Sequence, residues 1–205
     1  MGFYSRYIVP PLINCACGAK PIRYQRRKIV PRARGVVLEL GFGSGLNMPF
    51  YDAAKVERIY ALEPEEGMLA RARKIARHAS IPFEILAERA EANSLPVRSV
   101  DTVLVTYALC TIPDAEAALE EARRVLKQGG QLLFCEHGLA PDADVARTQA
   151  SMEKWWKHLA GGCHLTRDIP KLVRDAGFDI DDIEAMYLPS TPRALGYNVW
   201  GAAFP

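Results

Sequence analysis

Three glycines at alternate positions follow a short apolar run, in the segment Glu39-Leu40-Gly41-Phe42-Gly43-Ser44-Gly45-Leu46-Asn47. Glycines permit a tight turn and let backbone N–H groups approach a ligand without a Cβ in the way. Glu63 ends the next apolar run, eighteen residues beyond Gly45. Its carboxylate can accept hydrogen bonds from two hydroxyls at once. These residue types predict a loop that binds a cofactor.

Two classes of cofactor use such a loop. The dinucleotide pattern Gly-x-Gly-x-x-Gly fails here, because its last position is Leu46 when it starts at Gly41 and Met48 when it starts at Gly43. The spacing therefore argues against an NAD-type site. A glycine turn with a purely structural role, in a non-catalytic or NAD-type Rossmann protein, stays as an alternative that a cofactor titration would test.

The elements that must position these residues alternate along the chain. Short apolar runs predict five strands, at 36–40, 58–62, 83–87, 102–106 and 131–137. Apolar spacings of three and four predict helices around 68–79, from about 118 to a glycine cap at Gly129-Gly130, and around 143–159 and 168–176. Two last strands, about 178–188 and 195–204, leave no room for a helix between them, so we expect them to pair antiparallel.

This order predicts an α/β fold: a Rossmann-like, seven-stranded, mostly parallel sheet with helices on both faces and a C-terminal antiparallel strand pair. Ligands of such sheets bind outside the carboxyl ends of the strands, near the reversal of strand order. The segments expected there begin at Gly41, Glu63, Tyr107 and His137.

The segment acidic-x-Gly-x-Gly-x-Gly resembles the first motif of class I S-adenosylmethionine-dependent methyltransferases. The resemblance implies that S-adenosyl-L-methionine is the cofactor, with its methionine part over the glycine loop, its ribose at the acidic residue after the second strand, and its adenine near Ala90. Arg89 stands where many relatives have an Asp that accepts from the adenine amino group. The implied cofactor-binding residues are Glu39, Gly41, Gly43, Gly45, Asn47, Glu63, Pro64, Ala90 and Tyr107.

Further segments resemble a narrower group. They are Gly2–Tyr4, Tyr107–Ile112, Cys135–Gly138 and Gly161–Arg167. Together they look like small bacterial methyltransferases of the phosphatidylethanolamine N-methyltransferase type, and the last three also resemble the eukaryotic alkyl-thiol methyltransferases. A phospholipid headgroup amine and an alkyl thiol both remain open as the acceptor. A nucleic-acid methyltransferase is a third alternative, but the Asp/Asn-Pro-Pro-Tyr type of motif is replaced by Tyr107-Ala108-Leu109.

Methyl transfer is an in-line displacement, for which positioning can supply roughly 7–11 kcal/mol. A thiol or ammonium acceptor must first lose a proton. His137 is the first candidate base, because the reference pKa of imidazole, about 6.5, suits neutral pH. His164 and Tyr107 are second candidates. The five cysteines show no CxxC spacing, so we expect neither a metal site nor a disulfide framework, and a reducing cytoplasm as the compartment.

Charge is unevenly distributed. The whole chain of 205 residues carries a formal charge of +2, which excludes a protein built to coat nucleic acid, and no nucleic-acid partner is expected. Residues 1–35 nevertheless hold eight basic side chains and no acidic one. We therefore predict a basic helical arm over 1–35, with short helices starting at Pro11 and Pro21, and a methyltransferase domain over 36–205. The arm would be a solvated lid on the sheet, or would contact anionic membrane, where each Lys or Arg contributes about 1 kcal/mol.

Overall fold

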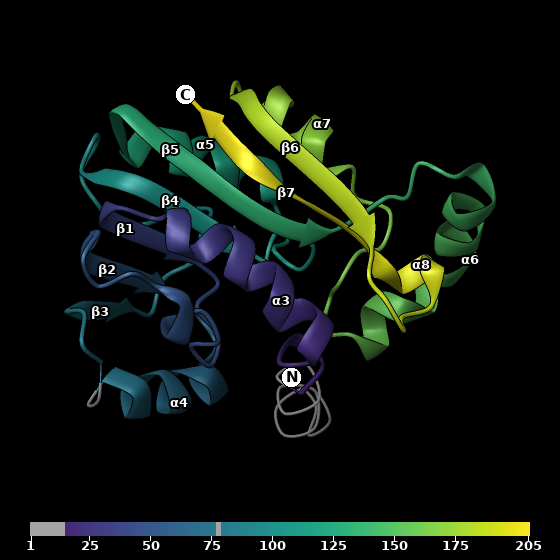
Figure 1. Cartoon of the computed structure of the whole chain (residues 1–205), viewed down its shortest axis with the longest axis horizontal. Helices are drawn as coiled ribbons and strands as arrows, with labels where there is room; N and C mark the ends of the chain where they lie inside the picture. Colours follow the sequence, from purple (N-terminus) through teal and green to yellow (C-terminus); the bar gives the residue numbers. More distant parts are fainter. Residues whose placement is uncertain (1–14, 77–78) are drawn as a thin grey trace.

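The computed structural model describes residues 15–76 and 79–205 and contains one seven-stranded sheet (Figure 1). Its strand order is β3-β2-β1-β4-β5-β7-β6. The strands are β1 Gly35–Leu40, β2 Val56–Leu62, β3 Phe83–Leu86, β4 Val100–Thr106, β5 Leu126–His137, β6 Asp179–Tyr187 and β7 Tyr197–Phe204. The first five run parallel, and β7 pairs antiparallel with both β5 and β6. The predicted fold class is confirmed.

The central strands are apolar almost throughout because both faces of the sheet are covered. Leu38 of β1 and its register partner Val103 of β4 are fully buried. The strand order reverses between β1 and β4, since the chain leaves β1 toward β2 and β3 and returns on the other side. The carboxyl ends of these two strands therefore flank the crevice where such sheets bind ligands.

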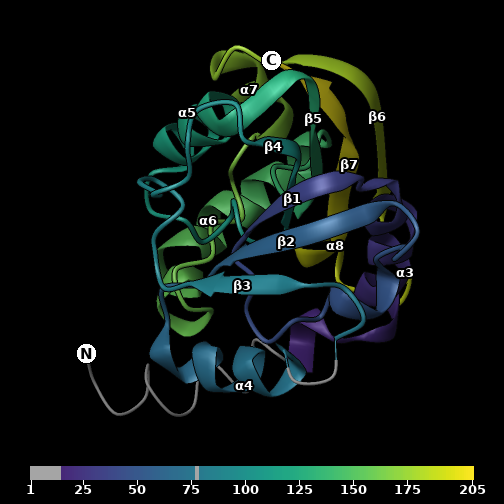
Figure 2. The same ribbon diagram turned by 90° about the vertical axis from the view of Figure 1, so that its left-hand side faces the viewer.

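Helices lie on both faces of the sheet (Figure 2). They are α3 Lys20–Ile29, α4 Glu66–Ala76, α5 Ala115–Val125, α6 Ala143–Leu159, α7 Ile169–Asp175 and α8 Arg193–Gly196. The apolar stripe of α5 and two buried residues of α7, Ile169 and Val173, pack on one face. On the other face, Ile29 and Val30 pack with Leu133 of β5 and Trp200 of β7. The start of α3 and the helices α6 and α8 lie beyond the carboxyl ends of β4 and β5 (Figure 1).

A helix follows the fourth strand, as predicted, but its predicted end at a Gly129-Gly130 cap was wrong. The helix ends at Val125, and Leu126 is already extended and pairs with Val100 of β4. The two glycines instead belong to the entry of β5. At Gly130 a Cβ would lie 3.1 Å from the carbonyl oxygen of Asp101, so the close approach of neighbouring backbone explains this glycine.

The expectation that no helix fits before the last strand was also wrong. Strand β7 begins at Tyr197 rather than near 195, and the one-turn helix α8, Arg193–Gly196, precedes it. Pro192 at its N-terminus has an extended backbone, which suits the residue before a short helix. The antiparallel pairing of β6 with β7 is confirmed.

The basic arm is partly built into the fold. Helix α3 contains Pro21 in its first turn, as predicted, and a 3-10 turn over Val30–Arg32 follows it. Gln25, Arg26 and Ile29 of this helix are buried, while Lys20, Arg23 and Arg27 are exposed. The helix expected at Pro11 and the segment Gly2–Tyr4 lie outside the described residues. Within the described part of the chain, no helix is long and apolar enough to cross a membrane.

Candidate active site

The glycine loop lies at the carboxyl end of β1, as expected, and its backbone requires glycine. Gly41, Gly43 and Gly45 all have positive φ, between +59° and +78°. A Cβ on Gly41 would lie 2.7 Å from the Cβ of Ala108, in the loop that follows β4. The two loops that flank the reversal of strand order therefore touch at Gly41, and any side chain there would push them apart.

Glu63 follows β2 and holds the glycine loop from the side. Its Oε2 accepts the N–H of Gly43 at 2.7 Å and its Oε1 accepts the N–H of Glu65 at 2.9 Å. Burial raises the pKa of Glu63, and the two backbone donors act in the opposite direction. Each carboxylate oxygen keeps a lone pair that can accept from a ligand hydroxyl. Pro64, the next residue, is exposed.

A buried polar network lies beneath the glycine loop. Oε1 of Glu39 accepts from Nδ2 of Asn47 at 2.9 Å, and Oε2 accepts from the hydroxyl of Tyr51 at 2.6 Å. Nη1 of Arg26 donates to Oδ1 of Asn47 and to Oγ1 of Thr106, at 2.6 Å each. Sequence reasoning assigned Glu39 and Asn47 to the cofactor, and the geometry gives both a role in holding the loop.

This network contains one buried cation and one buried carboxyl group. Burial raises the pKa of Glu39 to about 7, while the hydrogen bonds from Tyr51 and Asn47 and the charge of Arg26 lower it. The guanidinium carbon of Arg26 also lies 5.1 Å from the ring centre of Tyr107. Arg26 thus joins helix α3 to the ends of β1 and β4. This role could not be predicted from the sequence, because Arg26 lies among other basic residues of an amphipathic helix.

The loop after β4 is fixed by two residues that sequence reasoning missed. Oε1 of Glu136 accepts the N–H groups of Ala108 and Leu109, at 2.8 and 3.1 Å. The guanidinium of Arg167 donates to the carbonyls of Leu109 and Ile112. Burial raises the pKa of Glu136 to about 7. These contacts close the loop into one geometry, and Tyr107 at its start has φ +53°, a strained value for a residue other than glycine.

A cavity of about 340 Å³ lies beside this loop, at the carboxyl edge of the sheet. Its lining includes Pro21 and Ile22 at the start of α3, together with Tyr107, His137 and Asn198. The Tyr107 hydroxyl donates to Oδ1 of Asn198 at 2.5 Å. Most of the remaining lining is apolar and includes Trp156, Leu165, Leu188 and Leu195. The cavity suits a small, mainly apolar molecule with one polar end.

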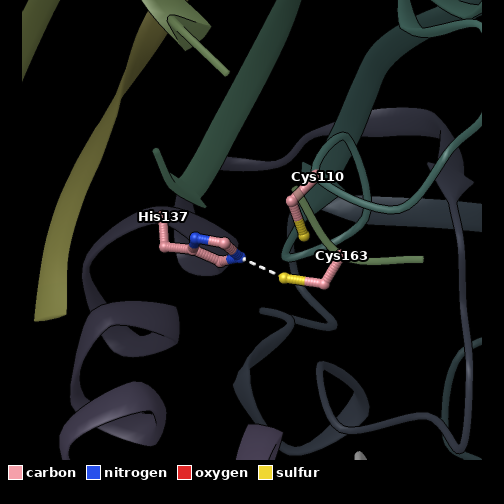
Figure 3. Close-up of side chains that lie close together, drawn as sticks. All are labelled: Cys110, His137 and Cys163. Carbon is pink, nitrogen blue, oxygen red and sulfur yellow. Dashed lines mark hydrogen bonds between the residues drawn. The ribbon is translucent and has the colours of Figure 1, made fainter. Parts of the chain in front are cut away.

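Three side chains converge on the cavity wall: Cys110, His137 and Cys163 (Figure 3). Nε2 of His137 lies 3.0 Å from Sγ of Cys163, and Nε1 of Trp156 donates to the same sulfur at 3.4 Å. Hydrogen bonds from Cys110 and His137 lower the pKa of Cys163 to about 4. Burial opposes protonation of His137, but its contact with Cys163 raises the pKa of the imidazole above its usual value.

The predicted base candidates are not all in one place. His137 and Tyr107 both line the cavity. His164 turns toward α6 instead, where its Nδ1 lies 2.6 Å from Oε1 of Glu153. Ala90 is buried in the loop after β3, and its neighbour Arg89 pairs with Glu91 at 2.6 Å.

Known proteins show which family the chain resembles. A family model described as a methyltransferase domain matches residues 38–134. A thiol S-methyltransferase of Rattus norvegicus is 34% identical over 169 residues, which cover 82% of this chain and 69% of the relative. The chain belongs to the class I S-adenosylmethionine-dependent methyltransferases.

Another relative of this methyltransferase is named for a different acceptor. A phosphatidylethanolamine N-methyltransferase of Cereibacter sphaeroides is 26% identical over 148 residues, which cover 71% of each chain. A solved S-adenosylmethionine-dependent methyltransferase from Mesorhizobium loti superposes with a TM-score of 0.67 at 20% identity, covering 91% of this chain and 99% of that one. The second likeness concerns the fold alone.

The residues present fit S-adenosylmethionine. At Gly43 an added Cβ would meet nothing closer than the carbonyl oxygen of Gly41 at 4.0 Å, so the loop leaves open space there, and Glu63 offers free lone pairs beside it. When bound, this cofactor supplies a methyl group activated by a sulfonium. The methyltransferase itself has to orient the acceptor in line with that methyl group and exclude water.

Proposed function

We propose that this methyltransferase transfers the methyl group to the sulfur of a small, mainly apolar thiol. The observation that carries the proposal is the cavity of about 340 Å³, whose apolar lining is interrupted by Tyr107, His137 and the sulfurs of Cys110 and Cys163. An apolar wall favours the carbon chain of such a molecule, and the polar end can receive its thiol. The thiol S-methyltransferases among the relatives support this acceptor.

The thiol must lose its proton before its sulfur attacks the methyl carbon. His137 stays our candidate to take part in that step, because it lies on the cavity wall at the end of β5. Tyr107 is fixed by its bond to Asn198 and is better placed to orient the acceptor than to remove a proton. His164 is the weaker second candidate, because its imidazole contacts Glu153 of α6 and does not line the cavity.

A labelled-methyl assay tests the acceptor directly. We expect methyl thioethers from a panel of alkyl and aryl thiols, and a much lower rate with phosphatidylethanolamine liposomes. In single-turnover reactions His137→Ala should be slower than the wild type, while His158→Ala, an exposed histidine on α6, should match it. Methylation of the phospholipid with no thiol activity would overturn the proposal, and an unchanged rate in His137→Ala would remove that residue from the mechanism.

A second candidate acceptor is a phospholipid headgroup, reached by peripheral contact with an anionic membrane. The observation in its favour is the outer face of α3, where Tyr24 is 59% exposed among exposed basic residues. These basic residues are Lys20, Arg23 and Arg27. At about 1 kcal/mol each, their loss should weaken binding to anionic vesicles about 100-fold.

The membrane test needs charge reversal rather than deletion of the arm. Removing residues 1–30 would also remove Arg26 and Ile29, which are buried in the fold. Cosedimentation should therefore compare a triple Glu variant of the outer face of α3 with a matched triple Glu variant on α4. The control positions on α4 are the exposed Arg71, Arg73 and Lys74. Equal binding by both variants would exclude α3 as a membrane contact. A cytoplasmic location without a nucleic-acid partner stays a prediction.

A further inference from the structure

We propose that Cys110, His137 and Cys163 bind a zinc ion whose fourth coordination position faces the acceptor cavity. The three ligand atoms all lie within 4.8 Å of one another, and all three side chains line that cavity. Figure 3 shows both sulfurs and the imidazole nitrogen directed toward one another. Two thiolates, one imidazole and an open position make a donor set that proteins use for catalytic zinc.

The distances suit a tetrahedral ion with little rearrangement. Zinc bonds of about 2.3 Å to sulfur and about 2.0–2.1 Å to nitrogen place neighbouring ligand atoms roughly 3.6–3.8 Å apart. The pair formed by His137 Nε2 and Cys163 Sγ is closer than this, at 3.0 Å, and every pair is within 4.8 Å. Small rotations of the side chains bring all three to bonding distance.

The surroundings also suit a metal. Trp156 donates its indole N–H to Cys163 Sγ at 3.4 Å, so a ligand sulfur already has an outer hydrogen bond of the kind that orients metal ligands. Zinc with two thiolates and a neutral imidazole has no net charge, which limits the cost of placing it against an apolar cavity. The sequence concealed this site because its ligands come from three elements: the loop after β4, the end of β5 and the segment between α6 and α7.

The zinc ion would activate the acceptor, and this part of the inference rests on the proposed thiol substrate. A substrate thiol would bind zinc through its sulfur and release its proton to water, since a coordinating thiol is deprotonated outright. The new S–CH₃ bond then forms as the bond between the methyl carbon and the sulfonium sulfur breaks. A thioether and S-adenosylhomocysteine leave, and the zinc ion is unchanged.

Titration of the metal-free, reduced protein with Co²⁺ alone tests the site without any activity measurement. We expect one Co²⁺ per chain, thiolate-to-metal charge-transfer absorption, the intense visible bands of a tetrahedral site, and displacement by Zn²⁺. Cys163→Ser should weaken binding more than about 100-fold, because even residues outside the ligand set cost 10–100-fold. Cys15→Ser, an exposed cysteine, should bind like the wild type.

Two further measurements keep the test decisive. Circular dichroism shows whether Cys163→Ser folds, and His137→Cys, which keeps three ligands, should retain Co²⁺ with stronger charge-transfer absorption. The inference fails if the wild type binds neither metal, if Cys163→Ser binds as tightly as the wild type, or if metal-free protein methylates thiols at the full rate. That last result would leave the proposed function intact. Zinc bound at one per chain without thiol methylation would confirm the metal site and overturn the acceptor.

Discussion

Gly41 allows the contact between the two loops of the active site to be measured as a free energy. An alanine at this position meets two penalties: φ is +68°, and the new Cβ lies 2.7 Å from the Cβ of Ala108. Gly129, at the entry of β5, has φ +75° but nothing within 4 Å of an added Cβ. The pair Gly41→Ala and Gly129→Ala therefore shares the backbone penalty and differs in the steric one.

The expected magnitudes follow from this difference. The left-handed conformation costs an alanine roughly 1–2 kcal/mol, and the loss of glycine's freedom in the unfolded chain returns about 0.4–1 kcal/mol. We expect Gly129→Ala to lower the free energy of unfolding by about 1 kcal/mol. Forcing an extra carbon into a packed site adds about 1–3 kcal/mol, so Gly41→Ala should lose about 2–4 kcal/mol.

Urea unfolding followed by tryptophan fluorescence gives both free energies, provided that the m-values agree. Calorimetric titration with S-adenosylmethionine gives the second readout. We expect Gly41→Ala to bind the cofactor at least about tenfold more weakly, and Gly129→Ala, at the opposite edge of the sheet, to bind it normally. Equal losses of stability in the two variants, or normal cofactor affinity in Gly41→Ala, would refute the reasoning.

Three more predictions concern the charged residues of the site. Glu63→Gln removes the charge that accepts the N–H of Gly43; we expect about 10–100-fold weaker binding of S-adenosylmethionine in a calorimetric titration, with Glu65→Gln as an unaffected control. Burial raises the pKa of the Glu39 carboxyl group from 4.5 to about 7. The unfolded chain therefore loses this proton at a lower pH than the folded protein does. The free energy of unfolding should fall by about 3 kcal/mol as the pH rises from 4.5 to 7. In urea unfolding at several pH values, the midpoint of Glu39→Gln should fall less with rising pH than that of the wild type. The same pH dependence in both proteins would show that Glu39 does not cause the fall. Arg26→Met leaves the buried network without its cation and should lower the free energy of unfolding by about 3–5 kcal/mol, measured with urea. The control Arg23→Met, at an exposed position, should change it by no more than about 0.5 kcal/mol. Similar losses in the two variants would show that Arg26 is not buried in solution.

The sheet could be predicted from sequence because its strands are short apolar runs bounded by breakers. The boundary between α5 and β5 could not, because Leu126 also completes the apolar stripe of the helix. Only its pairing with Val100 across the sheet removes it from that helix. The local pattern around Leu126 suits both a helix and a strand. The pairing of Leu126 with β4 selects the strand.

The parts of the site that depend on distant contacts could not be read from local patterns. The glycine loop and Glu63 have a fixed spacing and were found. Arg26 has no distinguishing neighbours in the sequence, and its partner Thr106 is eighty residues away. Cys110 and Cys163 lack any short spacing, and only the strand order brings their loops to the same edge of the sheet.

Helix α3 has a consequence for how the two substrates bind. Its first turn lines the acceptor cavity through Pro21 and Ile22, while Arg26, one turn further along, holds Asn47 at the end of the glycine loop. A ligand that stabilises this helix at one place favours the other, so we expect cofactor and acceptor to bind cooperatively. The factor must be the same in both directions. Acceptor affinity measured with and without S-adenosylhomocysteine gives that factor, and a ratio of one would show that α3 transmits nothing.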